Sequence, residues 1–261
     1  PPGQDIFYRV RFDDINASET RLGHFRTPGG NRDVTFVFGG DQCGAGWGIN
    51  PHWGGLKIFE TMRKTHPDFL IHLGDRIYSD KPILKRASMP DGNKWENIIT
   101  PAKSQVAESL EDYRGNYSYN FLDTHYRNFC KEVPAFTTWD DHEVTNNWWP
   151  GRKLSRRIMF RKGYTQTDVD SLVRNGRQAF FDFTPMQRHQ TDPNRIFRKV
   201  SYGSYVDVFL LDSRSYRSQN NRNQQKSPGK DTALLGQIQI NWLKGALSES
   251  NALWKIIANP L

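Results

Sequence analysis

The sequence predicts an α/β fold, and three observations support this prediction. Short apolar runs rich in β-forming residues alternate along the chain with stretches of helical spacing. Four of these runs end at an aspartate or an acidic cluster, where α/β proteins commonly place their ligand-binding residues. No internal repeat or low-complexity tract indicates another architecture. The 261 residues suffice for one large domain or two small ones.

The opening of the chain is predicted to belong to a different unit from the rest. Residues 6–12 alternate loosely, as a strand does, and Pro, Gly and polar residues follow up to about residue 32. Residues 1–32 therefore resemble the last strand of a preceding β-domain followed by a linker. The main domain is expected at residues 33–261.

The remaining elements follow in order. Strands are predicted at residues 34–38, 69–73, 134–139 and 205–211, ending at Asp41, Asp75, the cluster 140–143 and Asp212, and a last strand covers 254–258. Helical spacing is found at 54–65, 171–189 and 232–249, and 104–132 is helical or irregular. Residues 213–231, rich in Ser, Asn, Gln and Arg, form a polar surface loop.

Composition excludes some classes of protein. Two cysteines, Cys43 and Cys130, do not make a disulfide framework, although one bridge is possible. No run of 18 apolar residues predicts a membrane span. The net charge of +8 favours anionic partners. Basic residues cluster within 152–162, which indicates a solvated helix face or a rim that guides an anionic substrate.

The first two strand ends carry candidate metal ligands. Asp41 and Cys43 stand two apart, and a carboxylate with a thiolate suits a transition metal; Cys43 as a small hydrophobic core residue is the alternative. In Gly74-Asp75-Arg76-Ile77-Tyr78, Asp75 can place oxygens between two cations and Tyr78 can supply a phenolate. The alternative for Asp75 is a residue that caps the following turn.

The third strand end, Trp139-Asp140-Asp141-His142-Glu143-Val144-Thr145-Asn146-Asn147, is the most specific motif. Burying so many polar groups is costly without a metal or a salt-bridge network. No motif of a nucleic-acid-binding fold is present, so no specific nucleic-acid partner is expected.

The order of these motifs resembles the alkaline phosphatase D (PhoD-like) family of the calcineurin-like metallophosphoesterases. Two later segments add to the resemblance: Leu-Asp-Ser-Arg-Ser-Tyr-Arg at 211–217, and the segment with Gln239 and Trp242. The similarity covers roughly residues 34–261. It implies a four-layer αββα sandwich, with two mixed sheets packed together and helices outside. The opening strand is similar to the end of the β-sandwich domain that precedes the catalytic domain in this family.

The resemblance also implies a metal site. Asp41, Cys43, Asp75 and Tyr78 would surround Fe³⁺, and Asp75 would bridge to Ca²⁺, which Asp141 would also hold; Mn²⁺ or Zn²⁺ are the alternative metals. His142 would contact the phosphoryl group or protonate the leaving oxygen. Asn146 and Arg214 are weaker candidates for substrate contacts, and a salt bridge with Asp212 is the alternative role for Arg214.

The implied activity is hydrolysis of phosphate mono- or diesters, including polymers or lipid headgroups, by a secreted, periplasmic or cell-surface enzyme. The late histidine ligands of metallophosphoesterases have no counterpart before Leu261, and His66 and His72 are expected to be packing or surface residues. The chain is therefore expected to be truncated, or to take these ligands from a second polypeptide. A non-catalytic fragment that binds metal or polyanions is the alternative function.

Overall fold

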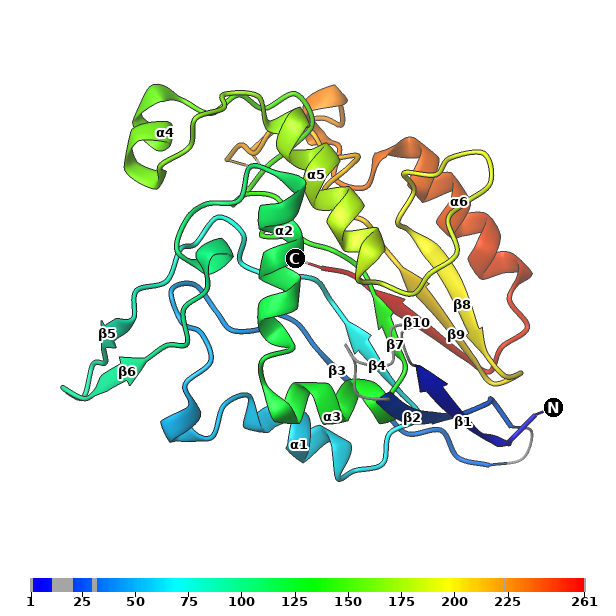
Figure 1. Ribbon diagram of the computed structural model, residues 1–261. Helices are drawn as coiled ribbons and strands as arrows, with labels where there is room; N and C mark the ends of the chain where they lie inside the picture. The colour runs from blue at the N-terminus through cyan, green and yellow to red at the C-terminus, as the bar shows by residue number, and fades with distance from the viewer. Residues whose placement is uncertain (1, 11–20, 30–31, 223, 261) are drawn as a thin grey trace.

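A computed structural model describes residues 2–10, 21–29, 32–222 and 224–260 as a mixed α/β structure built around two three-stranded sheets (Figure 1). The first sheet has the order β3-β4-β7 and is parallel. The second has the order β10-β9-β8, with β9 parallel to β10 and antiparallel to β8. The strands are β3 (Phe36–Gly39), β4 (Phe69–His72), β7 (Ala135–Thr137), β8 (Arg198–Tyr202), β9 (Val206–Leu210) and β10 (Trp254–Ala258).

The register of the first sheet positions the site. Gly39, His72 and Thr137 are the last residues of β3, β4 and β7, and they lie opposite one another. The segments that follow the three strands therefore leave the sheet at the same edge.

The two sheets share a core. Phe69 and Ile71 of β4 pack with Val208 and Leu210 of β9 and with Tyr202 of β8. All residues of β4 and β9 are buried, which explains why both strands consist largely of apolar residues.

Helices cover the outer faces of the sheets. The first sheet packs through Leu70 against Phe59 of α1 (Lys57–Arg63) and Phe129 of α3 (Thr124–Glu132). On the second sheet, Phe209 contacts Trp242 of α6 (Gly236–Glu249).

Two further helices pack beside the strand ends. They are α2 (Leu110–Asn120), which begins with a capping box between Ser109 and Asp112, and α5 (Val169–Asp182). Their apolar residues join a core cluster with Trp139, Val144 and Trp148. The short helix α4 (Arg156–Lys162) projects beyond this cluster at the upper left of Figure 1.

The start of the chain forms a hairpin. β1 (Asp5–Val10) pairs antiparallel with β2 (Arg21–Arg26), and the Tyr8 hydroxyl donates to the Lys131 carbonyl at 3.4 Å. The strand predicted at residues 6–12 is confirmed as β1, and its last two positions lie outside the described residues. A second hairpin joins β5 (Arg86–Ser88) to β6 (Lys94–Glu96).

Several expectations need correction. The helix predicted at 171–189 ends at Asp182, because Pro185 follows and the residue before a proline avoids helical geometry. The loop predicted at 213–231 runs into a 3₁₀ turn, Lys230–Thr232. Cys43 and Cys130 are both free thiols, so no bridge joins them.

Candidate metal centre

The chain turns sharply after β3 and β4. Asp41, Cys43 and Asp75 have φ values of 55°, 66° and 54°, a left-handed conformation that costs a residue with a side chain on the order of 1–3 kcal/mol. Backbone hydrogen bonds tie the two turns together: Asp41 donates to the Gly74 carbonyl at 3.3 Å and Gln42 to the Asp75 carbonyl at 2.8 Å. Strained geometry at the ends of neighbouring strands is typical of a functional site.

A buried carboxylate links the β4 turn to the β7 turn. Glu143 accepts hydrogen bonds from the backbone N–H groups of Asp75 at 3.0 Å, Arg76 at 2.7 Å and Asp140 at 2.8 Å. Its side chain is fully buried. Glu143 therefore holds the two turns in register, and both of its oxygens are occupied by this structural role.

Three buried residues at this junction form a group able to hold a cation. Candidate ligand atoms of Asp75, Asp141 and His142 all lie within 4.8 Å of one another. The His142 backbone N–H donates to Asp75 Oδ1 at 3.1 Å, and His142 Nε2 lies 3.8 Å from Asp141 Oδ1. The structure thus brings together three residues that come from two different strand ends.

Asp41 and Tyr78 extend this group toward β3. The Tyr78 hydroxyl donates to Asp41 Oδ1 at 2.7 Å. The Tyr78 ring stacks on the imidazole of His142, with ring centroids 4.3 Å apart. Burial and the hydrogen bond to Asp41 raise the pKa of Tyr78 well above its ordinary value, so its phenol loses a proton only if a cation replaces it.

The electrostatics of the group fit a cation. Burial, and then the charges of Glu143 and Asp141, raise the pKa of Asp75 to about 10. The pKa of Asp140 rises to about 6, again chiefly by burial. A metal ion binds carboxylate oxygens by displacing such protons. The donor set of carboxylates and phenol is therefore chemically suited to a multivalent metal.

Cys43 is not part of the three-residue group. Its Sγ lies 3.9 Å from Asn120 Oδ1, and Asn120 donates to the Arg76 carbonyl at 2.7 Å. Burial raises the pKa of the Cys43 thiol to about 12. The thiol thus lies close to the β4 turn, and its role as a metal ligand stays a prediction.

Asp80 is a site residue that the sequence analysis missed. Its fully buried carboxylate binds His142 Nδ1 and Lys162 Nζ, and accepts from the Asn146 backbone N–H at 3.1 Å. It stands five residues after Asp75 in the same turn, which is a signal in the sequence. Its partner Lys162, however, is 82 residues away, a contact that local patterns do not reveal.

The Asp80 contact controls the charge of His142. Burial alone would lower the pKa of the imidazole, but the hydrogen bond to Asp80 and the charges of Asp80 and Asp141 outweigh burial and raise it. Burial alone would raise the pKa of Asp80, and the contacts with His142 and Lys162 instead lower it well below its usual range. These contacts therefore favour a protonated His142 imidazole beside an ionised Asp80 carboxylate.

Arg214 points into the same acidic junction. Its Nε contacts Asp140 Oδ1 at 2.5 Å, and one terminal nitrogen lies 3.8 Å from Asp141 Oδ2. The alternative of a salt bridge with Asp212 is wrong, because Asp212 accepts the backbone N–H of Arg214 instead. Its Nη1 is buried without a hydrogen-bond partner, so Arg214 retains a donor. Asn146 lies beside Asp80, with its backbone N–H bound there.

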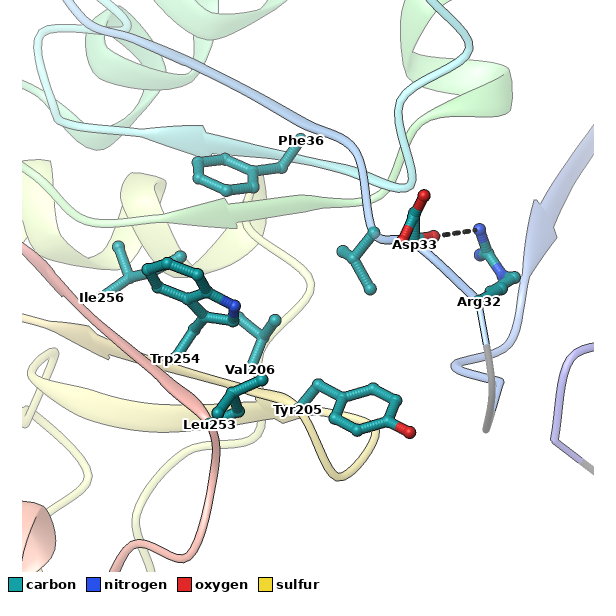
Figure 2. A pocket seen from close by; sticks show the side chains of 9 residues that line it. Arg32, Asp33, Phe36, Tyr205, Val206, Leu253, Trp254 and Ile256 are labelled. Carbon is teal, nitrogen blue, oxygen red and sulfur yellow. Dashed lines mark hydrogen bonds between the residues drawn. The ribbon is translucent and has the colours of Figure 1, made fainter.

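A large cavity among the described residues lies elsewhere. It measures about 750 Å³ and opens between β3 and β10, where Figure 2 shows Phe36 facing Trp254 and Ile256. Its lining is mostly apolar and contains none of the candidate ligands. Cavity size therefore does not locate the candidate metal site, which the side chains at the strand ends indicate instead.

Comparison with known proteins agrees with this geometry. A model of the PhoD-like phosphatase family matches residues 36–261. The chain belongs to this family. Alkaline phosphatase D of Bacillus subtilis (strain 168) is 26% identical over 271 residues, which cover 100% of this chain and 43% of that protein. A solved structure described as "Structure of PhoD" has a TM-score of 0.71 and 26% identity, covering 98% of this chain and 47% of that one.

The PhoD-like chain therefore spans less than half the length of these two proteins. In the part of the chain that the structure describes, no helix combines the length and apolarity needed to cross a bilayer.

Proposed function

We propose that this PhoD-like chain is the metal-binding core of a phosphoesterase that hydrolyses phosphate mono- or diesters. The observation that carries the proposal is the buried group of Asp75, Asp141 and His142 at the adjoining ends of β4 and β7. A purely structural role would not require Asp75 to be buried beside the charges of Glu143 and Asp141, which together raise its pKa far above the ordinary value.

Two cations fit the donors. Asp41, Cys43, Asp75 and Tyr78 would hold Fe³⁺, and Asp75 with Asp141 would hold Ca²⁺; Mn²⁺ or Zn²⁺ are the alternatives. Bound metal ions would neutralise phosphoryl oxygens and lower the pKa of a water molecule.

The protein's own residues supply the proton and the orientation. His142, whose protonated form is favoured by Asp80, would donate a proton from Nε2 to the departing oxygen. Asp80 fixes the ring orientation by occupying Nδ1. Arg214 would use its unpartnered Nη1 to orient a phosphoryl oxygen, and Asn146 is a second candidate contact.

Several finer expectations belong to the same proposal. The packing of α1 and α3 on one sheet and of α6 on the other supports a four-layer αββα arrangement. Residues 1–32 would be the end of a preceding β-domain. Polymeric phosphate esters or lipid headgroups are the candidate substrates, outside the cytoplasm, and a second polypeptide is a candidate source of further ligands.

The test is turnover by the full chain. Purified protein supplied with Fe³⁺ and Ca²⁺ should hydrolyse p-nitrophenyl phosphate or bis-p-nitrophenyl phosphate. Asp75→Asn should abolish both bound metal and turnover, whereas Asp231→Asn, an exposed acid outside the group, should change neither. Stoichiometric metal without turnover would instead establish the alternative, a non-catalytic metal-binding fragment. No metal bound to the wild-type chain would refute the proposal for this chain.

A further inference from the structure

The segment of residues 151–167, which carries α4, has an unusual charge pattern. It contains six cations and no acidic residue. Lys162 contacts Asp80, and Arg152 lies over the Trp149 ring. The other four cations form no ion pair with any described residue: Lys153, Arg156, Arg157 and Arg161. Their charge is therefore available to a partner.

The two faces of α4 differ. Ile158 and Met159 pack against the core cluster below the helix. Phe160 is 94% exposed, more than any other large hydrophobic residue in the described part of the chain. Arg156 and Arg157 precede it by four and three residues, the spacing that brings helical side chains together. A projecting phenyl ring thus shares its helix face with two arginines, and we call Arg156, Arg157, Phe160 and Arg161 the α4 patch.

The patch lies on a helix that is connected to the proposed active site. Lys162, the last residue of α4, contacts the Asp80 carboxylate that also binds His142. Figure 1 shows α4 projecting from the body of the molecule on its two flanking segments. A surface that contacted α4 would therefore lie beside the strand ends.

We propose that the α4 patch docks the protein on an anionic lipid surface. Basic side chains are attracted to anionic headgroups, and an aromatic ring gains free energy by entering the headgroup–acyl boundary. A dissolved polyanion would engage the arginines but would leave Phe160 in water. The extreme exposure of Phe160 among unpaired arginines therefore favours a lipid surface. This inference goes beyond the proposed function and does not depend on turnover.

The test is sedimentation of the full chain with vesicles at low salt. The protein should bind phosphatidylcholine vesicles that contain 30% phosphatidylglycerol and should not bind pure phosphatidylcholine. Each cation near such a surface is worth about 1 kcal/mol, or about fivefold in affinity. The triple variant Arg156→Gln, Arg157→Gln, Arg161→Gln should therefore bind about 100-fold more weakly. Phe160→Ala should bind at least about tenfold more weakly.

Matched variants provide the controls. Lys57→Gln, Lys94→Gln, Lys244→Gln removes the same total charge from exposed sites elsewhere, and Ile238→Ala removes another exposed apolar side chain; both should bind like the wild type. Equal losses in the patch and control triples would mean that net charge alone is responsible. Unchanged binding of Phe160→Ala would mean that the patch serves a dissolved polyanion. Either outcome, or no vesicle binding by the wild type, overturns the inference, whether or not the chain turns over phosphate esters.

Discussion

At the scale of single residues, His142 is the proposed general acid, and its ring orientation is fixed by Asp80. Its Nδ1 is occupied by Asp80, and its Nε2 faces Asp141. We expect His142→Ala to retain metal and to lower kcat by about 10²-fold or more, the usual consequence of losing a general acid. Metal analysis by mass spectrometry together with steady-state kinetics checks this. Unchanged kcat with metal in place would remove His142 from the reaction.

Asp80 gives a prediction about pH. Because the Asp80 carboxylate raises the pKa of His142, Asp80→Asn should lower it. The protonated imidazole would then be lost at lower pH, so the alkaline limb of the kcat profile should move to lower pH. Kinetics from pH 5 to pH 10 test this. A profile that falls in height but does not move would indicate that Asp80 acts only on the fold.

Cys43 is expected to be a metal ligand from the resemblance to the family, but it is not part of the three-residue group of Asp75, Asp141 and His142. A buried thiol whose pKa is raised to about 12 becomes a thiolate only by binding a cation. Cys43→Ala is expected to lose iron while its circular dichroism spectrum stays unchanged. Cys130→Ala, the other free thiol, is the matched control and should keep its iron. Unchanged iron in Cys43→Ala would exclude the thiol as a ligand.

At the scale of elements, the turn after β4 depends on one glycine. Gly74 has φ of 95°, and a Cβ there would lie 2.6 Å from the Asp140 backbone nitrogen. Gly74→Ala should therefore combine backbone strain with a clash and destabilise the fold by about 3 kcal/mol or more. Gly163 has φ of 85° and nothing within 4 Å of its Cβ position, so an alanine there adds backbone strain without a clash. Gly163→Ala should therefore destabilise the fold by only about 1 kcal/mol. Urea unfolding compares the two, and equal losses would mean that close packing at Gly74 is unimportant.

The elements that the sequence predicted are those with a strong local signal. β4 and β9 are buried on both faces and appear as apolar runs. β8 was not predicted because it begins with Arg198 and Lys199 and only Tyr202 of its five residues is buried. The basic cluster within 152–162 indicated a solvated helix face or a rim that guides an anionic substrate, and residues 156–162 form the helix α4.

Individual residues of the site could be predicted from the sequence, but their long-range contacts could not. Asp75 and Asp141 follow recognisable strands, and the structure brings them together. The contact of Arg214 with Asp140 spans 74 residues, and that of Asp80 with Lys162 spans 82. Such pairs depend on how the strand ends meet, which local sequence patterns do not specify.

At the scale of the whole molecule, the buried acids link stability to metal and pH. In the folded chain the pKa of Asp75 rises to about 10 and that of Glu143 to about 7, chiefly through burial, whereas unfolded carboxyl groups titrate near pH 4. Between these values the folded chain holds more protons than the unfolded chain. The stability that these groups contribute is therefore complete below about pH 4 and is lost as pH rises toward 10.

Metal should reverse this loss, because a bound cation takes the place of the retained protons. We expect the Tm of chelator-treated protein to fall by about 5 °C or more between pH 6 and pH 9, and metal to restore most of it. Differential scanning calorimetry with and without added Ca²⁺ and Fe³⁺ measures both effects. Asp75→Asn should flatten the dependence on pH. A Tm of the metal-free wild type that does not change with pH would mean that ionisation of these acids does not destabilise the fold.

The left-handed backbone at Asp41, Cys43 and Asp75 implies a conflict between durability and chemistry. Glycine adopts this conformation without strain, so a library of variants selected only for heat resistance should drift toward glycine at these three positions. The same library selected for hydrolysis should reject glycine there. The positions at which glycine is enriched by one selection and rejected by the other would identify the reactive centre without a bound ligand.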